Sequence, residues 1–253
     1  MIIIKAYLGA GIIQAANEIQ NVVIKFKVRG LLRFLSHAQM MMVFQRACVR
    51  ANFNLKYSEG FNPRPRISLP LPRPVGIESD DELIIFSLIS DCSGQQTQNT
   101  TEGGGIQTEL SAQLPEGCEL LSVCIDREKT QFQPCSAVYV LILKEQEEYL
   151  LKKLRNTAKE LLDSESLVVS RPINIKSSNH GHAGRDEAKS REINVREYFE
   201  SIEFDDRKIM IKFRITSTGS IRIQEILDLL NLDIDKLAVP IRRTNVQWQD
   251  SKN

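Results

Sequence analysis

Residues Tyr57–Ser79 read YSEGFNPRPRISLPLPRPVGIES and hold five prolines and three arginines against two glutamates. Proline lacks a backbone donor, clashes with a preceding helical turn and pushes the residue before it toward an extended backbone. The pattern therefore predicts a stiff, extended, basic segment. Because its shape is largely set before binding, such a segment would bind an anion with little loss of entropy.

Alternating strands and helices are expected on both sides of this segment. VVIKFKV at 22–28 is rich in β-branched residues and predicts a strand. Ser36 and Gln39 have the spacing of a capping box, which predicts a helix from Ser36 to about Asn52. Further strands are expected at 67–71, 83–88 and 119–125, and a short helix at 108–113. The order β-α-β-β-α-β is the ferredoxin-like pattern.

The second half repeats this order. Strands or extended segments are expected at 138–143, 167–172, 206–216 and 238–246, and helices at 145–162 and 220–230. Polar stretches at 90–105 and 176–190 predict loops. We therefore expect an α+β protein of two tandem ferredoxin-like units with antiparallel sheets. The expected boundaries are an N-terminal extension at 1–20, a first unit at 21–128 that carries the basic proline-rich segment, and a second unit at 134–248.

The 253-residue chain has a formal net charge of only +1, but the charge is unevenly distributed. Between Val22 and Arg73 there are ten basic residues and a single acidic residue, Glu59. Such asymmetry favours contact with nucleic acid or another polyanion. The alternative is a solvated face whose charge is balanced by the acidic remainder of the chain.

The cysteines and the hydropathy exclude several classes of protein. The five cysteines are odd in number and none has CxxC spacing, which argues against a disulfide framework, a zinc site and an iron–sulfur site. We expect no metal, no cofactor and a reducing, cytoplasmic location. His180 and His182 form an H-x-H pair in a polar stretch without further ligands. No segment approaches 18 consecutive apolar residues, so no membrane span is expected.

Two long motifs resemble the radical-SAM-linked protein family, a bacterial domain of unknown function. They are GLLRFLSHAQMM at Gly30–Met41 and LKYSEGFNPRPRISLPLPRPVGIES at Leu55–Ser79. LPEG at 114–117, INVREY at 193–198 and RRT at 242–244 also match. The family usually reads SHLDL where this chain has Gln39, so no role for a carboxylate carries over to that position. Members occur beside radical SAM proteins or fused behind them, and near genes for RNA processing.

The resemblance implies a partner of a radical SAM enzyme rather than the enzyme itself, because the chain lacks CxxxCxxC. We expect a non-catalytic accessory protein that binds an anionic substrate in a basic groove, with RNA, such as tRNA or rRNA, as the favoured candidate. Arg64 and Arg66 flank Pro65 and would point the same way on an extended strand, about 6–7 Å apart. The expected binding residues are Arg33, Ser36, His37, Arg46, Arg50, Tyr57, Phe61, Asn62, Arg64, Arg66 and Arg73.

Two alternatives remain open at this point. The first is a metal-independent endoribonuclease in which His37, at the first turn of a helix, acts as a general base; alternatively, His37 only fixes the start of the helix. The second is a pure protein-interaction module that docks on the radical SAM enzyme. Tyr57 and Phe61 either stack on bases or pack internally, whereas Phe34 is expected to be buried.

Overall fold

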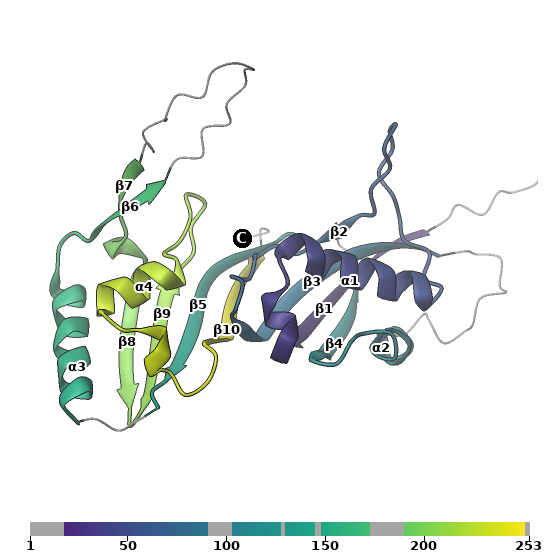
Figure 1. Ribbon diagram of the computed structural model, residues 1–253. Helices are drawn as coiled ribbons and strands as arrows, with labels where there is room; N and C mark the ends of the chain where they lie inside the picture. Colours follow the sequence, from purple (N-terminus) through teal and green to yellow (C-terminus); the bar gives the residue numbers. More distant parts are fainter. Residues whose placement is uncertain (1–17, 91–102, 128–129, 145–147, 173–189, 251–253) are drawn as a thin grey trace, which may run out of the picture.

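The computed structural model describes residues 18–90, 103–127, 130–144, 148–172 and 190–250 (Figure 1). It is a mixed α+β protein built on one eight-stranded, mostly antiparallel sheet that runs through both halves of the chain. The expected α+β class is therefore confirmed. Residues 1–17 of the expected extension at 1–20 lie outside the described residues. Most of the expected loops at 90–105 and 176–190 also lie outside them.

The first half lies on the right of Figure 1 and contributes four strands in the order β4-β1-β3-β2, with antiparallel neighbours throughout. Ser36 is the N-cap of α1 as predicted, and α1 packs on the sheet through Phe44, whose ring lies 4.7 Å from that of Phe26. The elements are β1 (Glu18–Val28), η1 (Gly30–Phe34), α1 (His37–Arg50), β2 (Ile67–Ser68), β3 (Glu78–Ser90), α2 (Gly103–Ser111) and β4 (Cys118–Asp126).

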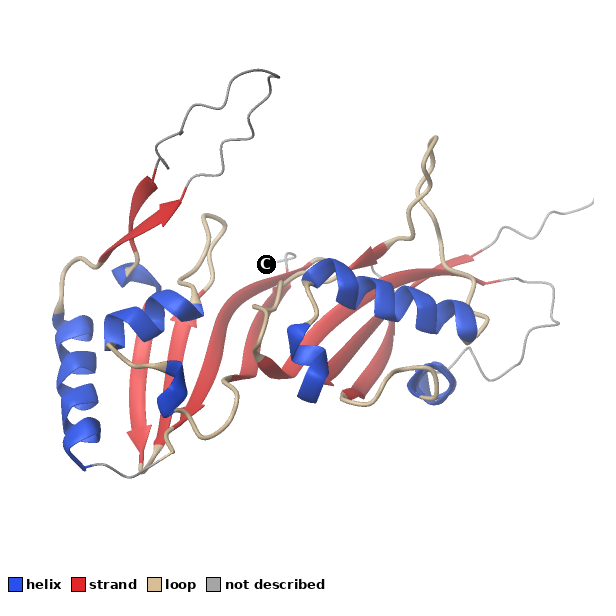
Figure 2. Ribbon diagram, in the orientation of Figure 1, coloured by secondary structure: helices blue, strands red, loops and turns tan. Residues whose placement is uncertain are grey.

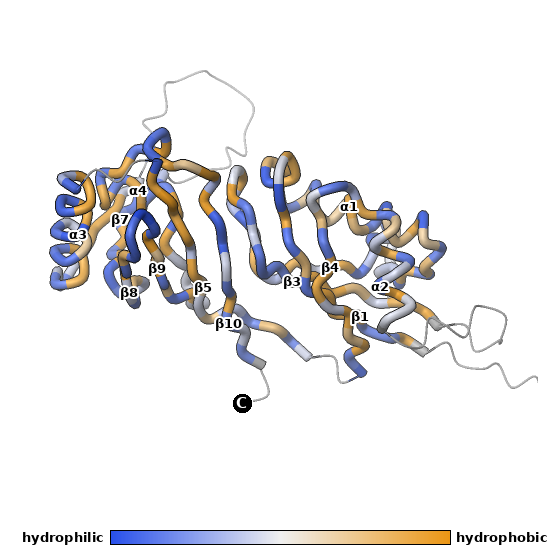
Figure 3. The backbone as a smooth tube through the Cα atoms, turned by 90° about the horizontal axis from the view of Figure 1, so that it is seen from below, coloured by the Kyte–Doolittle hydropathy of each residue, from blue (hydrophilic) through white to orange (hydrophobic). Residues whose placement is uncertain are grey.

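The second half contributes strands in the order β10-β5-β9-β8, again antiparallel. α3 turns its apolar side toward this part of the sheet and its polar side outward (Figure 3). The elements are β5 (Phe132–Ile142), α3 (Glu148–Asp163), β6 (Val168–Pro172), β7 (Ser190–Asn194), η2 (Arg196–Tyr198), β8 (Phe199–Asp205), β9 (Lys208–Arg214), α4 (Ile223–Leu230), η3 (Ile234–Lys236) and β10 (Arg242–Asp250).

Two strands of the second half differ from the sequence prediction. The extended segment expected at 167–172 pairs with β7 in a separate two-stranded sheet, which stands apart from the main sheet in Figure 2. The edge position next to β9 is taken by β8, which the sequence did not predict. A register shift between Phe199 and Ser201 interrupts the period-2 alternation of β8, so its sequence lacks a clear strand signal.

β10 joins the two halves into one sheet. It pairs with β5 in antiparallel fashion and with the start of β3 in parallel fashion, through Arg242 opposite Glu78 and Arg243 opposite Ser79. The hydrophobic cores nevertheless remain separate. One core surrounds Phe44 in the first half, and the other surrounds Tyr139 in the second half. The junction between them is correspondingly rich in charged residues.

The proline-rich segment is not one continuous extended ribbon, which corrects the prediction. Its first part folds back on itself as a hairpin, Lys56–Arg66, called here the basic hairpin, which rises from the sheet in Figure 2. Ser58 N donates to Arg64 O at 2.8 Å, and Arg66 N donates to Lys56 O at 2.8 Å. The chain can reverse because Gly60, at φ +131°, adopts a conformation that side chains disfavour.

Within the described residues, no helix has both the length and the apolar character that a bilayer crossing requires.

Candidate nucleic-acid interface

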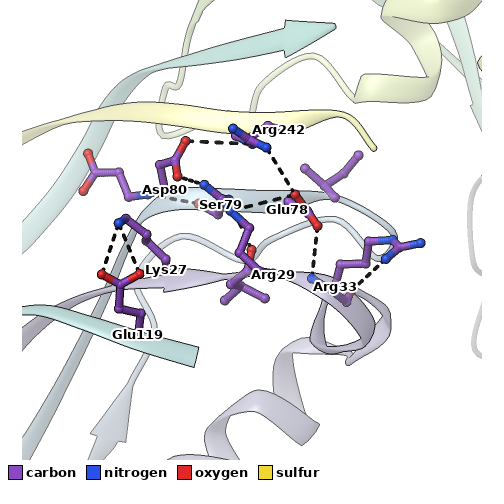
Figure 4. A network of polar contacts seen from close by, with 12 residues as sticks. Lys27, Arg29, Arg33, Glu78, Ser79, Asp80, Glu119 and Arg242 are labelled. Carbon is purple, nitrogen blue, oxygen red and sulfur yellow. Dashed lines mark hydrogen bonds and ion pairs between the residues drawn. The ribbon is translucent and has the colours of Figure 1, made fainter. Parts of the chain in front are cut away.

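An acidic run at the start of β3, Glu78–Glu82, ties the neighbouring strands together (Figure 4). Asp81 pairs with Lys25 of β1 at 3.2 Å and accepts a hydrogen bond from the backbone of β10. Asp80 pairs with Arg29. Glu78 accepts from the Gly30 backbone at 3.0 Å. These contacts neutralise part of the basic charge that the sequence concentrates between residues 22 and 73.

Arg243 and Glu82 form a buried ion pair at the centre of the junction. Arg243 Nη2 lies 2.6 Å from Glu82 Oε1, and both side chains are 2% exposed. Burial lowers the pKa of Arg243, but Glu82 and Tyr139 together outweigh that effect and raise the pKa above its usual range. Burial raises the pKa of the Tyr139 hydroxyl, and the nearby Arg243 opposes that shift. Arg243 therefore carries its positive charge where the two halves meet.

Arg73, one of the expected anion-binding residues, is buried beneath the surface and 8% exposed. Its guanidinium donates to backbone carbonyls of η1 and of the loop that precedes β3. Burial lowers the pKa of Arg73, and attraction by Glu82 opposes that effect. Arg73 thus fastens η1 to the junction and does not face solvent. The carbonyls that accept from it belong to Leu32, Arg33, Leu35, Pro74 and Ile77.

Seven of the ten basic residues between Val22 and Arg73 form no ion pair among the described residues, and six of these seven, all but the buried Arg73, are at least partly exposed. Arg50 instead donates to Gln113 Oε1 at 3.2 Å. Arg33 donates to Gly30 O at 2.9 Å and lies 4.2 Å from the centre of the Phe34 ring. The charge asymmetry of the sequence therefore survives at the surface of the first half. The six residues are Arg33, Arg46, Arg50, Lys56, Arg64 and Arg66.

Exposed aromatic rings accompany these cations. Phe61, in the turn of the basic hairpin, is 99% exposed, and Tyr57 is 42% exposed. Phe34 was expected to be buried, and that prediction is wrong, because it is 52% exposed. Arg73 holds η1 in a position from which Phe34 faces outward, where the Arg33 guanidinium covers its ring.

The remaining expected site residues have clear positions. Ser36 Oγ accepts from Gln39 N at 3.3 Å, and Gln39 Oε1 accepts from Ser36 N at 2.8 Å. An amide oxygen can accept in a capping box as a carboxylate does, so Gln39 satisfies this one. His37 begins α1, and its Nδ1 is buried without a hydrogen-bond partner. Asn62 is exposed in the turn of the basic hairpin.

The expected residues thus divide into two groups that are at least partly exposed and one buried member. Arg73 is the buried member, and it supports η1 from below. The first group belongs to η1 and the start and outer face of α1, and comprises Arg33, Ser36, His37, Arg46 and Arg50. The second group belongs to the basic hairpin and comprises Tyr57, Phe61, Asn62, Arg64 and Arg66.

Sequence reasoning missed the acidic run and its partner Arg243. The sequence did contain a signal for this ion-pair network. ESDDE directly precedes the apolar residues LIIF in one strand, and four acidic residues next to a buried strand require cations from other segments. The RRT motif at 242–244 supplies two of those cations.

The thiols provide a direct test of burial. At pH 8, iodoacetamide is expected to modify Cys124 in the native protein and to spare Cys48 and Cys118. Cys124 is exposed, whereas burial raises the pKa of the other two thiols to about 12. Only about 1 in 10,000 of those thiols would be ionised at pH 8. Peptide mass spectrometry measures the modification, with urea-denatured protein as the control. Equal native reaction rates at Cys48 and Cys124 would contradict the buried position of Cys48.

No group of three or more potential metal ligands occurs in the part of the chain that the structure describes. His180 and His182 lie outside that part.

The fold and the site define a mixed α+β protein with a buried ion pair at its centre and a surface of unpaired cations beside exposed aromatic rings. The chain belongs to a family of uncharacterized proteins conserved in bacteria (DUF2344), whose model matches residues 21–224. No curated protein matches the chain. Among solved structures, it is similar to the crystal structure of an unknown protein from Galdieria sulphuraria, with 10% identity over 92% of this chain and 99% of that one. The TM-score between the two is 0.25.

Proposed function

We propose that this protein is a cytoplasmic accessory protein of a separate radical SAM enzyme and that it binds an RNA substrate through its basic surface. The observation that carries the RNA-binding part is the group of six cations without acidic partners. The enzyme partner follows from the resemblance of Gly30–Met41 and Leu55–Ser79 to the radical-SAM-linked family. The accessory role follows from the lack of cluster-binding cysteines in the sequence.

The basic hairpin supplies the two kinds of contact that single-stranded RNA requires. Arg64 and Arg66 carry charge that can pair with phosphates, and both are exposed. Phe61 and Tyr57 offer ring faces on which bases can stack. The two strands of the hairpin are held together by backbone hydrogen bonds, so little ordering is required on binding.

We also propose that each half is a ferredoxin-like unit. The proposal rests on the repeated strand order, β4-β1-β3-β2 in the first half and β10-β5-β9-β8 in the second. In both halves, two helices connect four antiparallel strands in the order β-α-β-β-α-β once β6 and β7 are set aside. The parallel pairing of β3 with β10 would then join the sheets of the two units into one.

Charge reversal in the basic hairpin tests RNA binding. The double variant Arg64→Glu/Arg66→Glu is expected to bind tRNA or an rRNA fragment at least ~10-fold more weakly at low salt, because two phosphate contacts become repulsive. The slope of log affinity against log salt should fall by about 1.4, or about 0.7 for each lost contact with a single strand. Fluorescence anisotropy over a salt series measures both quantities.

A matched control changes the same charge elsewhere. Lys152→Glu/Lys159→Glu alters two exposed residues of α3 in the second half and should leave RNA affinity nearly unchanged. The proposal would be overturned if the wild-type protein showed no salt-dependent RNA binding, or if both double variants weakened it equally.

The 99% exposure of Phe61 also favours a second candidate, in which the hairpin docks on the radical SAM enzyme itself. A pull-down of that enzyme separates the two. Loss of enzyme capture by Phe61→Ala with RNA affinity retained would favour docking. RNA cleavage that disappears in His37→Ala would instead favour the endoribonuclease.

A further inference from the structure

A pocket of about 320 Å³ lies where the two halves meet, on the side of the sheet that carries the buried ion pair. The first half contributes Leu71, Pro72 and Pro74 from the loop before β3. The second half contributes residues of β5, β9 and β10 and the start of α4. Its size lies at the lower end of the range for small-molecule sites.

Most of the pocket wall is apolar and includes flat groups. Tyr139 and Phe213 both line it, and their rings stack on each other 5.2 Å apart and only 10° from parallel. Pro72 and Pro74 add rigid rings from the other half of the protein. Flat, apolar walls of this kind favour a planar ring system in the ligand.

The polar groups at this pocket include the side chains of two arginines, Arg222 and Arg243, which only donate. Arg243 lines it and is 2% exposed, yet its Nε has no hydrogen-bond partner. α4 begins at the pocket, and the backbone N–H groups of Ile223 and Gln224 have no acceptor among the described residues. The N-cap of α4 is Arg222, whose side chain has no acceptor atom to satisfy them. Glu225 accepts from the Arg222 N–H at 2.9 Å, so the helix start keeps the two N–H groups of Ile223 and Gln224 for a ligand. Two such donors beside an arginine are suited to bind an anion.

The acidic groups near the pocket already have partners. Glu82 pairs with Arg243, and Glu225 pairs with Arg171 at 2.6 Å. Burial opposes ionisation of Glu225, but hydrogen bonds from Arg171 and the Arg222 backbone outweigh it and lower its pKa. Neither carboxylate therefore presents an unpaired negative charge to an incoming anion.

We propose that this pocket binds a nucleoside monophosphate, with the base against the apolar wall and the phosphate at the start of α4 beside Arg222. The pocket is lined by flat apolar surface and by donors that can bind an anion. A nucleoside monophosphate carries the matching groups, a flat base and an anionic phosphate. The nucleotide can be free or can form the 5′-phosphorylated end of an RNA. The site is separate from the basic hairpin and goes beyond the RNA binding proposed above.

Isothermal titration calorimetry with the four nucleoside 5′-monophosphates tests this proposal on the full chain. At least one of them is expected to bind with micromolar to low-millimolar affinity, and tighter than its nucleoside or inorganic phosphate alone. Comparing a 5′-phosphorylated with a 5′-hydroxyl oligonucleotide of the same sequence distinguishes an RNA end from a free nucleotide. The aromatic carboxylate 4-hydroxyphenylacetate is titrated in the same way, to test whether the pocket prefers a ring with a carboxylate over a nucleotide.

Two variants locate the site. Arg222→Glu reverses an exposed charge at the pocket, and Ile223→Trp fills part of its volume. Each is expected to weaken nucleotide binding at least ~10-fold. Lys152→Glu and Arg64→Glu/Arg66→Glu should leave it unchanged, so that failure here and failure of the RNA-binding proposal remain distinguishable. The proposal is overturned if no monophosphate binds, if phosphate alone or the aromatic carboxylate binds as tightly, or if neither pocket variant weakens binding.

Discussion

Arg243→Met is expected to lower the free energy of unfolding by about 3–5 kcal/mol, because it leaves Glu82 charged and buried without a partner. The Arg243–Glu82 contact of 2.6 Å joins residues 161 positions apart in the chain and sits between the two cores. Urea unfolding followed by circular dichroism measures the change. The variant should lose stability throughout the molecule, because the ion pair lies where β10 meets β3.

The neighbouring residue provides the matched control. Arg242→Met removes the same type of charge one position earlier, where the side chain is 39% exposed and lies 3.6 Å from Glu78. The loss should be smaller, about 0–1 kcal/mol, because Arg242 is partly exposed and Glu78 keeps the Gly30 N–H and Arg29 as partners. The double variant Glu82→Leu/Arg243→Met should recover much of the lost stability, because no unpaired charge then remains buried. A loss in Arg243→Met no larger than that in Arg242→Met would contradict the importance of the buried pair.

The second large effect is expected at Gly117. Gly117→Ala should cost about 2–4 kcal/mol, from the disfavoured backbone conformation together with a steric clash. Gly117 has φ +87°, and a Cβ at this position would lie 2.6 Å from Arg29 O. Gly117 O accepts a hydrogen bond of 2.8 Å from Arg29 N, so the clash cannot be relieved without disturbing that contact. This geometry gives the LPEG motif at 114–117 a physical reason to end in glycine.

Gly104→Ala is the control for this substitution. Gly104 lies in α2, and nothing approaches the position of its missing Cβ within 4 Å. Alanine there should be neutral or should stabilise the helix by up to about 1 kcal/mol. The same urea denaturation series compares both variants with the wild type. An unchanged midpoint for Gly117→Ala would show that the turn before β4 relaxes more easily than its backbone contacts suggest.

Local sequence signals predicted several elements well. The capping box of Ser36 and Gln39 placed the start of α1 correctly, because its contacts lie within one turn. The periodic segments at 145–162 and 206–216 lie close to α3 and β9, since their apolar residues recur at the spacing of their own secondary structure. The predictions failed where contacts between distant segments decided the outcome.

Arg73 and Phe34 illustrate that limit. The sequence placed a charged residue outside and an aromatic residue inside, as their chemistry suggests, and the structure reverses both. Backbone carbonyls of η1 and of the loop before β3 accept hydrogen bonds from the buried Arg73 guanidinium and so replace the water that it loses on burial. No local pattern reveals that these carbonyls come together around one side chain.

Composition and local patterns alone therefore determined the α+β class, the sites of most helices and strands and the concentration of basic residues between Val22 and Arg73. The tertiary structure decided which of those charges remain unpaired. It pairs Lys25 and Arg29 with the acidic run, buries Arg73 and leaves Arg64 and Arg66 exposed on a hairpin. The physical reason is that the charge and burial of a side chain depend on partners brought near by folding, whereas helix and strand signals depend on residues a few positions away.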